Sequence, residues 1–129
     1  MSNERVDLPT ILVVEDNPTL RMTLVLLLNR LGYESDSAAN GIEAVRRVKN
    51  WQYKAVLMDI QMPEMDGLEA TCAIRAYEHS HGLEPVPIIA VTGDGDRNIC
   101  MTCGMNDFMR KPICKDDLTK MLEKHCSKM

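Results

Sequence analysis

The sequence has few aromatic residues, no long apolar run and no cluster of basic residues. Aromatic residues make up only 4% of its 129 residues, so the core must be built mainly from Leu, Ile, Val and Met. No apolar run approaches the roughly 20 residues that a membrane-spanning helix requires. The formal net charge is -4, whereas phosphate binding requires clustered Lys and Arg. We therefore expect no direct contact with nucleic acid or with a membrane.

A secretion signal is also missing. Residues 1–9 form a short polar segment that carries both charge signs, which excludes a signal peptide. We therefore expect a cytoplasmic protein, and its five cysteines, an odd number, should then be reduced. Cys100 and Cys103 have the spacing of a thioredoxin or zinc motif. Because no second pair accompanies them, we interpret them as ordinary thiols.

The rest of the composition is that of one ordinary globular domain. Hydrophobic residues make up 45% and charged residues 26%, a mixture that folds rather than staying disordered. A chain of this length can bury a sizeable core but is too short for two domains. We predict a single domain over residues 10–127, preceded by the polar segment 1–9.

Five apolar runs alternate with stretches of helical periodicity. Leu20, Leu24 and Leu28 recur at helical spacing, and so do Ile42 and Val45. The unbroken apolar runs suit parallel strands that are covered on both faces. We predict strands at residues 11–14, 55–58, 88–91 and 107–110, a weaker edge strand at 33–38, and a short helix at about 95–103. The alternation implies an α/β fold: a doubly wound, five-stranded parallel sheet of flavodoxin-like order 2-1-3-4-5, with five helices.

Polar residues stand where four of the predicted strands end. Glu15 and Asp16 follow the first strand, Asp59 the third, Thr92 the fourth and Lys111 the fifth. In open parallel sheets the ligand site lies at the carboxyl ends of the strands. Three acids, one hydroxyl and one amine are therefore expected to converge at one edge of the sheet.

Neighbouring carboxylates repel one another, and a hard divalent cation relieves that repulsion. Mg²⁺ prefers oxygen ligands and commonly takes one or two carboxylates, water and a phosphate oxygen. We predict Asp16 and Asp59 as direct Mg²⁺ ligands, with Glu15 bound directly or through water. The backbone carbonyl of Gln61 could complete the protein's share.

The same set of residues is suited to phosphoryl transfer. A bound cation neutralises charge on a phosphoryl group during transfer. Lys111 would add a positive charge on the other side, and Thr92 a hydroxyl donor. Because no group activates a serine or cysteine, the nucleophile must be a carboxylate, and we predict Asp59.

These residues and their contexts resemble the receiver domain of two-component response regulators. The resemblance runs from about Ile11 to His125, nearly the whole chain. Its motifs are Val13-Val-Glu-Asp-Asn17, Leu57-Met-Asp-Ile-Gln-Met-Pro-Glu-Met-Asp-Gly67, Ile88-Ile-Ala-Val-Thr-Gly93 and Phe108-Met-Arg-Lys-Pro112. Residues 59–71 are most similar to receivers of hybrid histidine kinases and phosphorelays.

The resemblance implies a function and roles for single residues. It implies Asp59 as the phosphoacceptor, supplied by phosphohistidine, with Glu15 and Asp16 holding Mg²⁺ and Lys111 contacting phosphate. The implied partner is a histidine kinase or a histidine phosphotransfer protein, and the chain would be a monomer or a weak dimer. Such a protein is a regulated phosphoacceptor that assists its own phosphorylation and dephosphorylation, and not a metabolic enzyme.

The resemblance also implies a conformational switch. Thr92 and Phe108 match the switch pair of the family, and Pro112 matches a proline that follows a cis peptide bond. The run Thr92-Gly93-Asp94 is a mild departure, because many relatives have Ala where this chain has Gly93, which still leaves room for the phosphoryl group. An acid at position 94 bears on the lifetime of the phosphoryl group.

Two other classes of protein remain as alternatives. One is a binding module that docks a partner without phosphorylation, although an intact Asp59 and Lys111 speak against it. The other is a hydrolase or flavin carrier on the same fold, which fold alone does not exclude. A haloacid-type phosphatase would need a second Asp two residues after the nucleophile at the first strand, and Glu15-Asp16-Asn17-Pro18 lacks that spacing.

Overall fold

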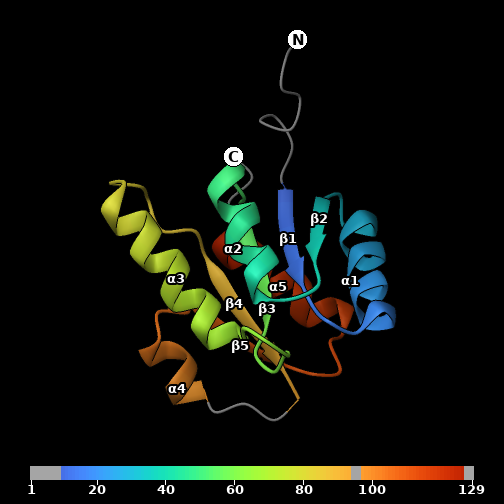
Figure 1. The fold of residues 1–129 in the computed structure, drawn as a ribbon. Helices are drawn as coiled ribbons and strands as arrows, with labels where there is room; N and C mark the ends of the chain where they lie inside the picture. Colours follow the sequence, from blue (N-terminus) through green and yellow to red (C-terminus); the bar gives the residue numbers. More distant parts are fainter. Residues whose placement is uncertain (1–9, 94–96, 127–129) are drawn as a thin grey trace.

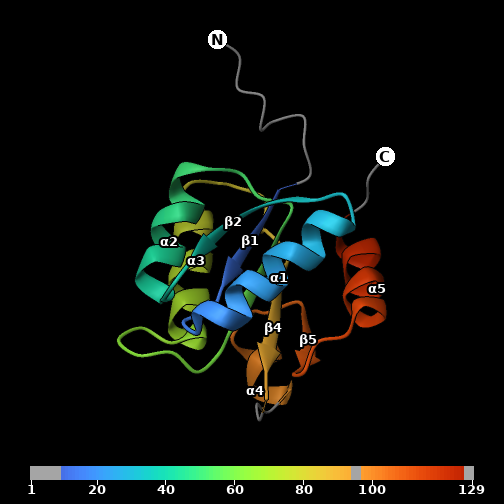
Figure 2. The ribbon, with the colours of Figure 1, turned by 90° about the vertical axis from the view of Figure 1, so that its right-hand side faces the viewer.

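The computed structural model describes residues 10–93 and 97–126, which form one sheet with helices on both faces (Figures 1 and 2). Strands and helices alternate along the chain, as the sequence predicts. The elements are β1 (Thr10–Val14), α1 (Pro18–Arg30), β2 (Glu34–Ala38), α2 (Gly41–Asn50), β3 (Ala55–Asp59), α3 (Gly67–Ser80), β4 (Ile88–Thr92), α4 (Arg97–Thr102), β5 (Asp107–Arg110) and α5 (Lys115–His125).

The five strands are all parallel and lie in the order β2-β1-β3-β4-β5. This confirms the predicted flavodoxin-like sheet. Val14 at the end of β1 pairs with Met58, and Asp59 at the end of β3 pairs with Val91. The carboxyl ends of the central strands are therefore level with one another.

Side chains of β1, β3, β4 and β5 alternate between two apolar cores, one on each face of the sheet. In β1, Leu12 and Val14 point into the core beneath α2, α3 and α4, while Ile11 and Val13 point into the core beneath α1 and α5. Figure 2 shows the two helical layers on opposite sides of the sheet. Because both faces are covered, β1, β3 and β4 are almost entirely apolar and buried. The edge strand β2 is instead polar and partly exposed.

Polar caps set the beginnings of the helices that follow β1 and β3. The Asn17 side chain accepts hydrogen bonds from the Thr19 and Leu20 backbone N–H groups at 2.9 and 3.1 Å. Asp66 and Glu69 form a reciprocal capping box at the start of α3. These caps fix the short loops that carry the acidic residues past the strand ends.

Two residues of the predicted helical periodicity lie outside the core. Leu20 and Ile42 are 40% and 44% exposed. Each lies in the first turn of its helix, and the buried positions come later, at Leu24 and Leu28 in α1 and at Ala44 in α2. Helical spacing places side chains on one face, but it does not show how far the sheet extends under the first turn.

Element boundaries differ slightly from those predicted. The short helix begins at Arg97 rather than near residue 95. Asp94, the rest of 94–96 and residue 127 of the predicted domain lie outside the described residues. Within the described ranges, no helix has the length and apolar character needed to span a membrane.

A buried ion cluster attaches α5 to the amino end of β5. Asp107 is 2% exposed, and its Oδ2 lies 2.9 Å from Lys124 Nζ and 2.8 Å from His125 Nε2. The Phe108 backbone N–H donates to Asp107 Oδ1 at 3.0 Å. Burial acts to raise the pKa of Asp107, but the hydrogen bonds from His125, Lys124 and Phe108 outweigh it and lower this pKa to about 2.

Candidate functional site

Every strand end that the sequence analysis singled out lies at one edge of the sheet. Glu15 and Asp16 directly follow β1, Asp59 is the last residue of β3, and Thr92 is the last residue of β4. Lys111 follows β5, and its backbone N–H donates to the Thr92 carbonyl oxygen at 2.8 Å. Parallel pairing and short loops are sufficient to bring these residues together.

Three carboxylates lie close together at this edge. Ligand oxygens of Glu15, Asp16 and Asp59 all lie within 4.8 Å of one another. Glu15 and Asp59 are 2% and 4% exposed, whereas Asp16 is open to solvent. The group thus consists of two buried acids and one acid that solvent can reach.

Lys111 is the cation of this site. Its Nζ lies 2.9 Å from Glu15 Oε1 and 3.5 Å from Asp59 Oδ1. Burial acts to lower the pKa of Lys111, but its close contact with Glu15 and the charge of Asp59 outweigh burial and raise it. Lys111 therefore stays an ammonium, and three carboxylates face one positive charge.

The carboxyl group of Asp59 is in an unfavourable environment for its charged form. Burial and, after it, the negative charge of Glu15 raise the pKa of Asp59 to about 6, although Lys111 acts in the opposite direction. The Gln61 backbone N–H also favours the charged form, donating to Asp59 Oδ1 at 3.3 Å. A further cation near this carboxylate would stabilise its charged form.

Glu15 is held rigidly and leaves one oxygen poorly satisfied. The Asn17 backbone N–H donates to Glu15 Oε2 at 3.1 Å, and Arg21 Nη1 donates to the Glu15 carbonyl at 2.7 Å. Glu15 Oε1 is buried, and apart from its ion pair with Lys111 it has no well-oriented hydrogen-bond donor. The contact of Arg21 was not predicted, because residue types alone do not show that its side chain reaches the Glu15 carbonyl.

The loop between β3 and α3 packs tightly beneath the acids. A Cβ atom on Gly67 would overlap the carbonyl oxygen of Asp59. The Gly67 backbone N–H instead donates to the Ile60 carbonyl at 2.9 Å. Gly41 N–H donates to the Met65 carbonyl at 3.1 Å, so α2 holds the far side of the same loop. Gly67 is thus required by close backbone approach, and it fixes where Asp59 lies.

The two predicted switch residues lie on neighbouring strands. Thr92 is 1% exposed at the end of β4. Phe108 in β5 pairs with Ala90 and packs in the core beneath α2, α3 and α4, at 9% exposure. The Arg110 guanidinium lies 5.3 Å from the centre of the Phe108 ring. The Lys111–Pro112 peptide bond is cis, as predicted.

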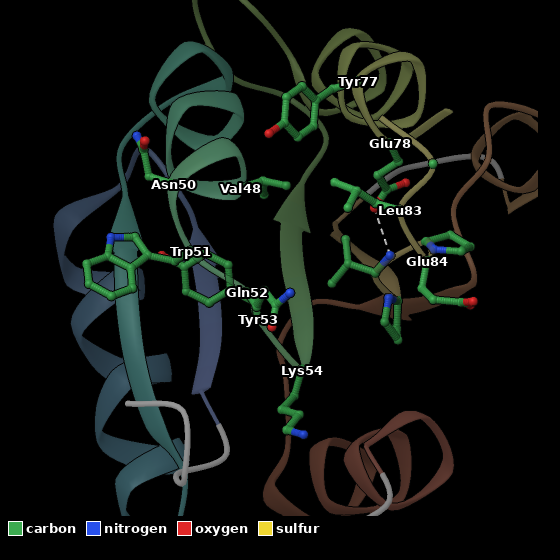
Figure 3. Close-up of a pocket in the computed structure, with 14 residues that line it drawn as sticks. Val48, Asn50, Trp51, Gln52, Tyr53, Lys54, Tyr77, Glu78, Leu83 and Glu84 are labelled. Carbon is green, nitrogen blue, oxygen red and sulfur yellow. Dashed lines mark hydrogen bonds between the residues drawn. The ribbon is translucent and has the colours of Figure 1, made fainter. Parts of the chain in front are cut away.

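A second concave feature lies at the opposite edge of the sheet (Figure 3). This groove of about 740 Å³ is formed by the segments that precede β3 and β4, with Trp51, Tyr53 and Leu83 among its lining residues. None of the predicted site residues lines it. This groove and the acidic cluster are therefore separate parts of the molecule.

The fold and the acidic edge together define a flavodoxin-like α/β protein with a group of carboxylates suited to a divalent cation. The family model of the response regulator receiver domain matches residues 11–123. The chain belongs to this family of signalling domains, which serve two-component systems and phosphorelays. This confirms the predicted class and its function in signal relay.

Similar proteins include hybrid kinases from distant organisms. The chain is 46% identical to hybrid signal transduction histidine kinase B of Dictyostelium discoideum, with 89% of this chain and 6% of the kinase covered. It is 42% identical to the CAI-1 autoinducer sensor kinase/phosphatase CqsS of Vibrio cholerae, with 84% and 16% covered. The chain thus spans only a small part of these relatives.

Solved structures give the same assignment. The receiver domain of sensor histidine kinase PA1611 from Pseudomonas aeruginosa, which has a magnesium ion coordinated in its active site cleft, is 40% identical, with a TM-score of 0.83 and coverage of 92% of this chain and 97% of that one. The receiver domain of Ssk1 from Saccharomyces cerevisiae, in complex with the histidine phosphotransfer protein Ypd1, is 29% identical, with a TM-score of 0.86 and coverage of 92% and 90%.

Proposed function

We propose that this domain accepts a phosphoryl group from a phosphohistidine on the carboxylate of Asp59. The observation that carries the proposal is the position of Asp59: buried at the end of β3, within 4.8 Å of two other acids and 3.5 Å from Lys111 Nζ. A buried carboxylate beside other acids is unfavourable for folding, so its presence needs a functional reason.

We propose Mg²⁺ as the ion of the acidic cluster. The donor set fits, because it consists of hard carboxylate oxygens, and Glu15 Oε1 lacks a well-oriented hydrogen-bond donor. Asp16 and Asp59 would be the direct protein ligands together with the Gln61 carbonyl, and Glu15 would bind through water or directly. Mg²⁺ supplies neutralisation of the charge on the transferred group.

The residues of the chain carry out the rest of the transfer. An Asp59 carboxylate oxygen attacks phosphorus, the bond from phosphorus to the donor's imidazole nitrogen breaks, and the imidazole leaves with the bonding electron pair. Lys111 balances charge on the phosphoryl oxygens, and Thr92 donates its hydroxyl to one of them. Because the product stays on the protein, the domain is a regulated acceptor and not an enzyme with turnover.

The partner we propose is a histidine kinase or a histidine phosphotransfer protein. Two lines support it: the relatives are hybrid histidine kinases, and a similar receiver was solved with a phosphotransfer protein. Such a partner would act in the cytoplasm, where we place the domain, as a monomer or a weak dimer.

Phosphorylation would act on the surface of α4, β5 and α5 through Thr92 and Phe108. A phosphoryl group on Asp59 offers oxygens that draw the Thr92 hydroxyl toward the site. The Phe108 ring already packs inward in this structure, 5.3 Å from the Arg110 guanidinium. Arg110 pairs with Thr92 in the sheet, so a movement of Thr92 would reach the ring through Arg110. Two arrangements separated by a few kcal/mol are enough for one such contact to shift the balance.

The phosphoacceptor is tested by comparing Asp59→Asn with Asp36→Asn. Both proteins are incubated with acetyl phosphate and Mg²⁺, and bound phosphate is located by peptide mapping. Asp36 is a suitable control because it lies on β2 and accepts a hydrogen bond from Tyr53, which an amide oxygen preserves. We expect label on Asp59 in the parent and in the control and none in Asp59→Asn. Equal labelling of all three would refute the assignment.

The switch is tested by amide spectra with and without beryllium fluoride, a phosphoryl mimic. We expect shifts at Thr92 and along β5, including Phe108, in addition to the loops around Asp59. In Phe108→Leu the shifts on α4 and α5 should shrink while those beside Asp59 remain. Shifts confined to the Asp59 loops in the parent would show a phosphoacceptor without this switch.

A further inference from the structure

Two cysteines that are far apart in the sequence lie on either side of the contact between α3 and the end of α4, where the Arg75 side chain of α3 meets Gly104. Cys72 is an exposed residue of α3, and Cys103, which directly follows α4, is partly exposed. Burial and, after it, the charge and hydrogen bonding of Cys72 raise the pKa of the Cys103 thiol. Cys100, which shares a C-x-x-C spacing with Cys103, is instead 1% exposed in the core.

The backbone fixes this juxtaposition independently of the thiols. Arg75 lies one helical turn after Cys72 on the same face of α3. Its Nε donates to the Gly104 carbonyl at 3.0 Å, and its Nη2 lies 2.8 Å from Asn106 Oδ1. Gly104 adopts a φ of 107° that ends α4, and an added Cβ there would lie 3.3 Å from the Arg75 side chain. The residue next to Cys103 is therefore held against the turn of α3 that follows Cys72.

We propose that Cys72 and Cys103 form a reversible disulfide when the domain meets a peroxide. The exposed Cys72 sulfur attacks the peroxide, the O–O bond breaks, and Cys72 becomes a sulfenic acid with release of one water. The Cys103 sulfur then attacks the Cys72 sulfur and expels hydroxide, which leaves as a second water. In balance, two thiols and one hydrogen peroxide yield one disulfide and two waters. A thiol reductant restores the pair.

The modification would link α3 to the end of α4. Helix α3 is anchored in the core through Ala70 and Ile74, so the cross-link would restrain α4 and add to the Arg75 contact. The disulfide itself does not depend on phosphoryl chemistry at Asp59, and only its effect on signalling would rest on the proposed function. A failure of one proposal therefore leaves the other standing.

The disulfide is tested on the reduced full chain with hydrogen peroxide, followed by alkylation of remaining thiols, digestion and mass spectrometry. We expect the protein to lose two hydrogen atoms and two of its five thiols, with a peptide that joins Cys72 to Cys103. Cys72→Ser and Cys103→Ser should both abolish the cross-link. Cys114→Ser is the matched control, because Cys114 is also exposed, and it should oxidise like the parent.

Two further measurements distinguish this disulfide from other products of cysteine oxidation. A dimedone-type probe should trap sulfenic acid at Cys72 at least tenfold more in Cys103→Ser than in the parent, because no second thiol consumes it. Oxidation should raise the midpoint of thermal unfolding by several degrees in the parent and in Cys114→Ser, but not in Cys72→Ser or Cys103→Ser. Dithiothreitol should reverse this rise. Equal trapping in both proteins, a Cys100–Cys103 link or a cross-link between chains would overturn the proposal.

Discussion

Two buried aspartates, Asp59 and Asp107, lie at opposite edges of the same sheet and have opposite electrostatic surroundings. Asp59 ends β3 and Asp107 begins β5, and they are 4% and 2% exposed. Burial and then Glu15 raise the pKa of Asp59 to about 6. Burial opposes ionisation of Asp107 as well, but donors from His125, Lys124 and the Phe108 backbone lower its pKa to about 2.

The contrast shows that burial raises the pKa of both carboxyl groups, and that the neighbours decide whether this effect is reinforced, as at Asp59, or outweighed, as at Asp107. The Asp107 cluster is satisfied within the protein, so it stabilises the fold and has no free capacity for a ligand. The Asp59 cluster has an excess of negative charge, so a ligand that adds positive charge gains free energy there. Local conflict of this kind is expected at functional sites.

Removing one acid of the cluster around Asp59 should have the largest effect on the rate of phosphorylation. We expect Asp16→Ala to slow Mg²⁺-dependent phosphorylation by acetyl phosphate about 100-fold, on the scale of disrupted metal sites. The apo protein should remain folded and become slightly more stable, because a repelling charge has gone. Glu34→Ala, which removes an exposed acid on β2, should change neither property. An unchanged Mg²⁺ titration in Asp16→Ala would refute the assignment of this ligand.

Neutralising Asp59 and neutralising Asp107 should change the free energy of unfolding in opposite directions. A pKa displacement of about two units corresponds to roughly 3 kcal/mol, and part of it is lost when partners rearrange. We expect Asp107→Asn to lower the free energy of unfolding at pH 7.5 by about 2 kcal/mol, and Asp59→Asn to raise it by about 1–2 kcal/mol. Urea unfolding without metal measures both. Changes of the same sign would show that the two sites do not differ as described.

The two aspartates should also be separable by pH. The pKa of Asp59 is raised from 3.8 to about 6 on folding, so the folded state binds more protons between these values, and apo stability falls as pH rises through that window. The pKa of Asp107 is lowered from 3.8 to about 2, so its contribution is complete above pH 3.8 and is lost as pH falls toward 2. Subtracting the stability curve of each Asn variant from the parent's curve isolates each group. A flat difference curve for Asp59→Asn between pH 4 and 6 would refute the raised pKa.

The sequence was sufficient to predict the sheet order and the residues at the Asp59 edge. The convergence of these residues follows from the alternation of strands and helices, because parallel strands bring their carboxyl ends together wherever the helices pack. The order 2-1-3-4-5 was predicted as the flavodoxin-like form of the doubly wound fold. Asp107 gave no comparable signal. Its partners Lys124 and His125 lie on a helix whose register against β5 is set by packing, and no local pattern encodes that register.

The same limit explains the remaining errors and omissions. The spacing of Cys100 and Cys103 suggests a local pair, but α4 turns Cys100 into the core and leaves Cys103 beside α3. The periodicity of α1 includes Leu20, which the sheet does not cover. Arg21 contacts the Glu15 carbonyl through a loop geometry that residue types alone do not specify.

The smallest effect we predict separates the two partners of Asp107. Both lie within 3 Å of Oδ2, but the Lys124 side chain is 64% exposed and that of His125 is 15% exposed. An exposed ammonium retains most of its hydration and gains little from an ion pair, typically below about 1 kcal/mol. The His125 Nε2–H instead donates from a largely buried ring, and its loss leaves a buried oxygen with one donor fewer.

We expect Lys124→Met to cost about 0.3 kcal/mol and His125→Phe about 1–2 kcal/mol, measured by urea unfolding at pH 7.5. Adding 0.5 M NaCl should remove most of the Lys124 difference and little of the His125 difference, because salt screens exposed pairs more strongly. If Lys124→Met proved the more costly change, the low pKa of Asp107 would depend on charge at the surface, and the contrast with Asp59 would be one of net charge rather than of buried hydrogen bonds.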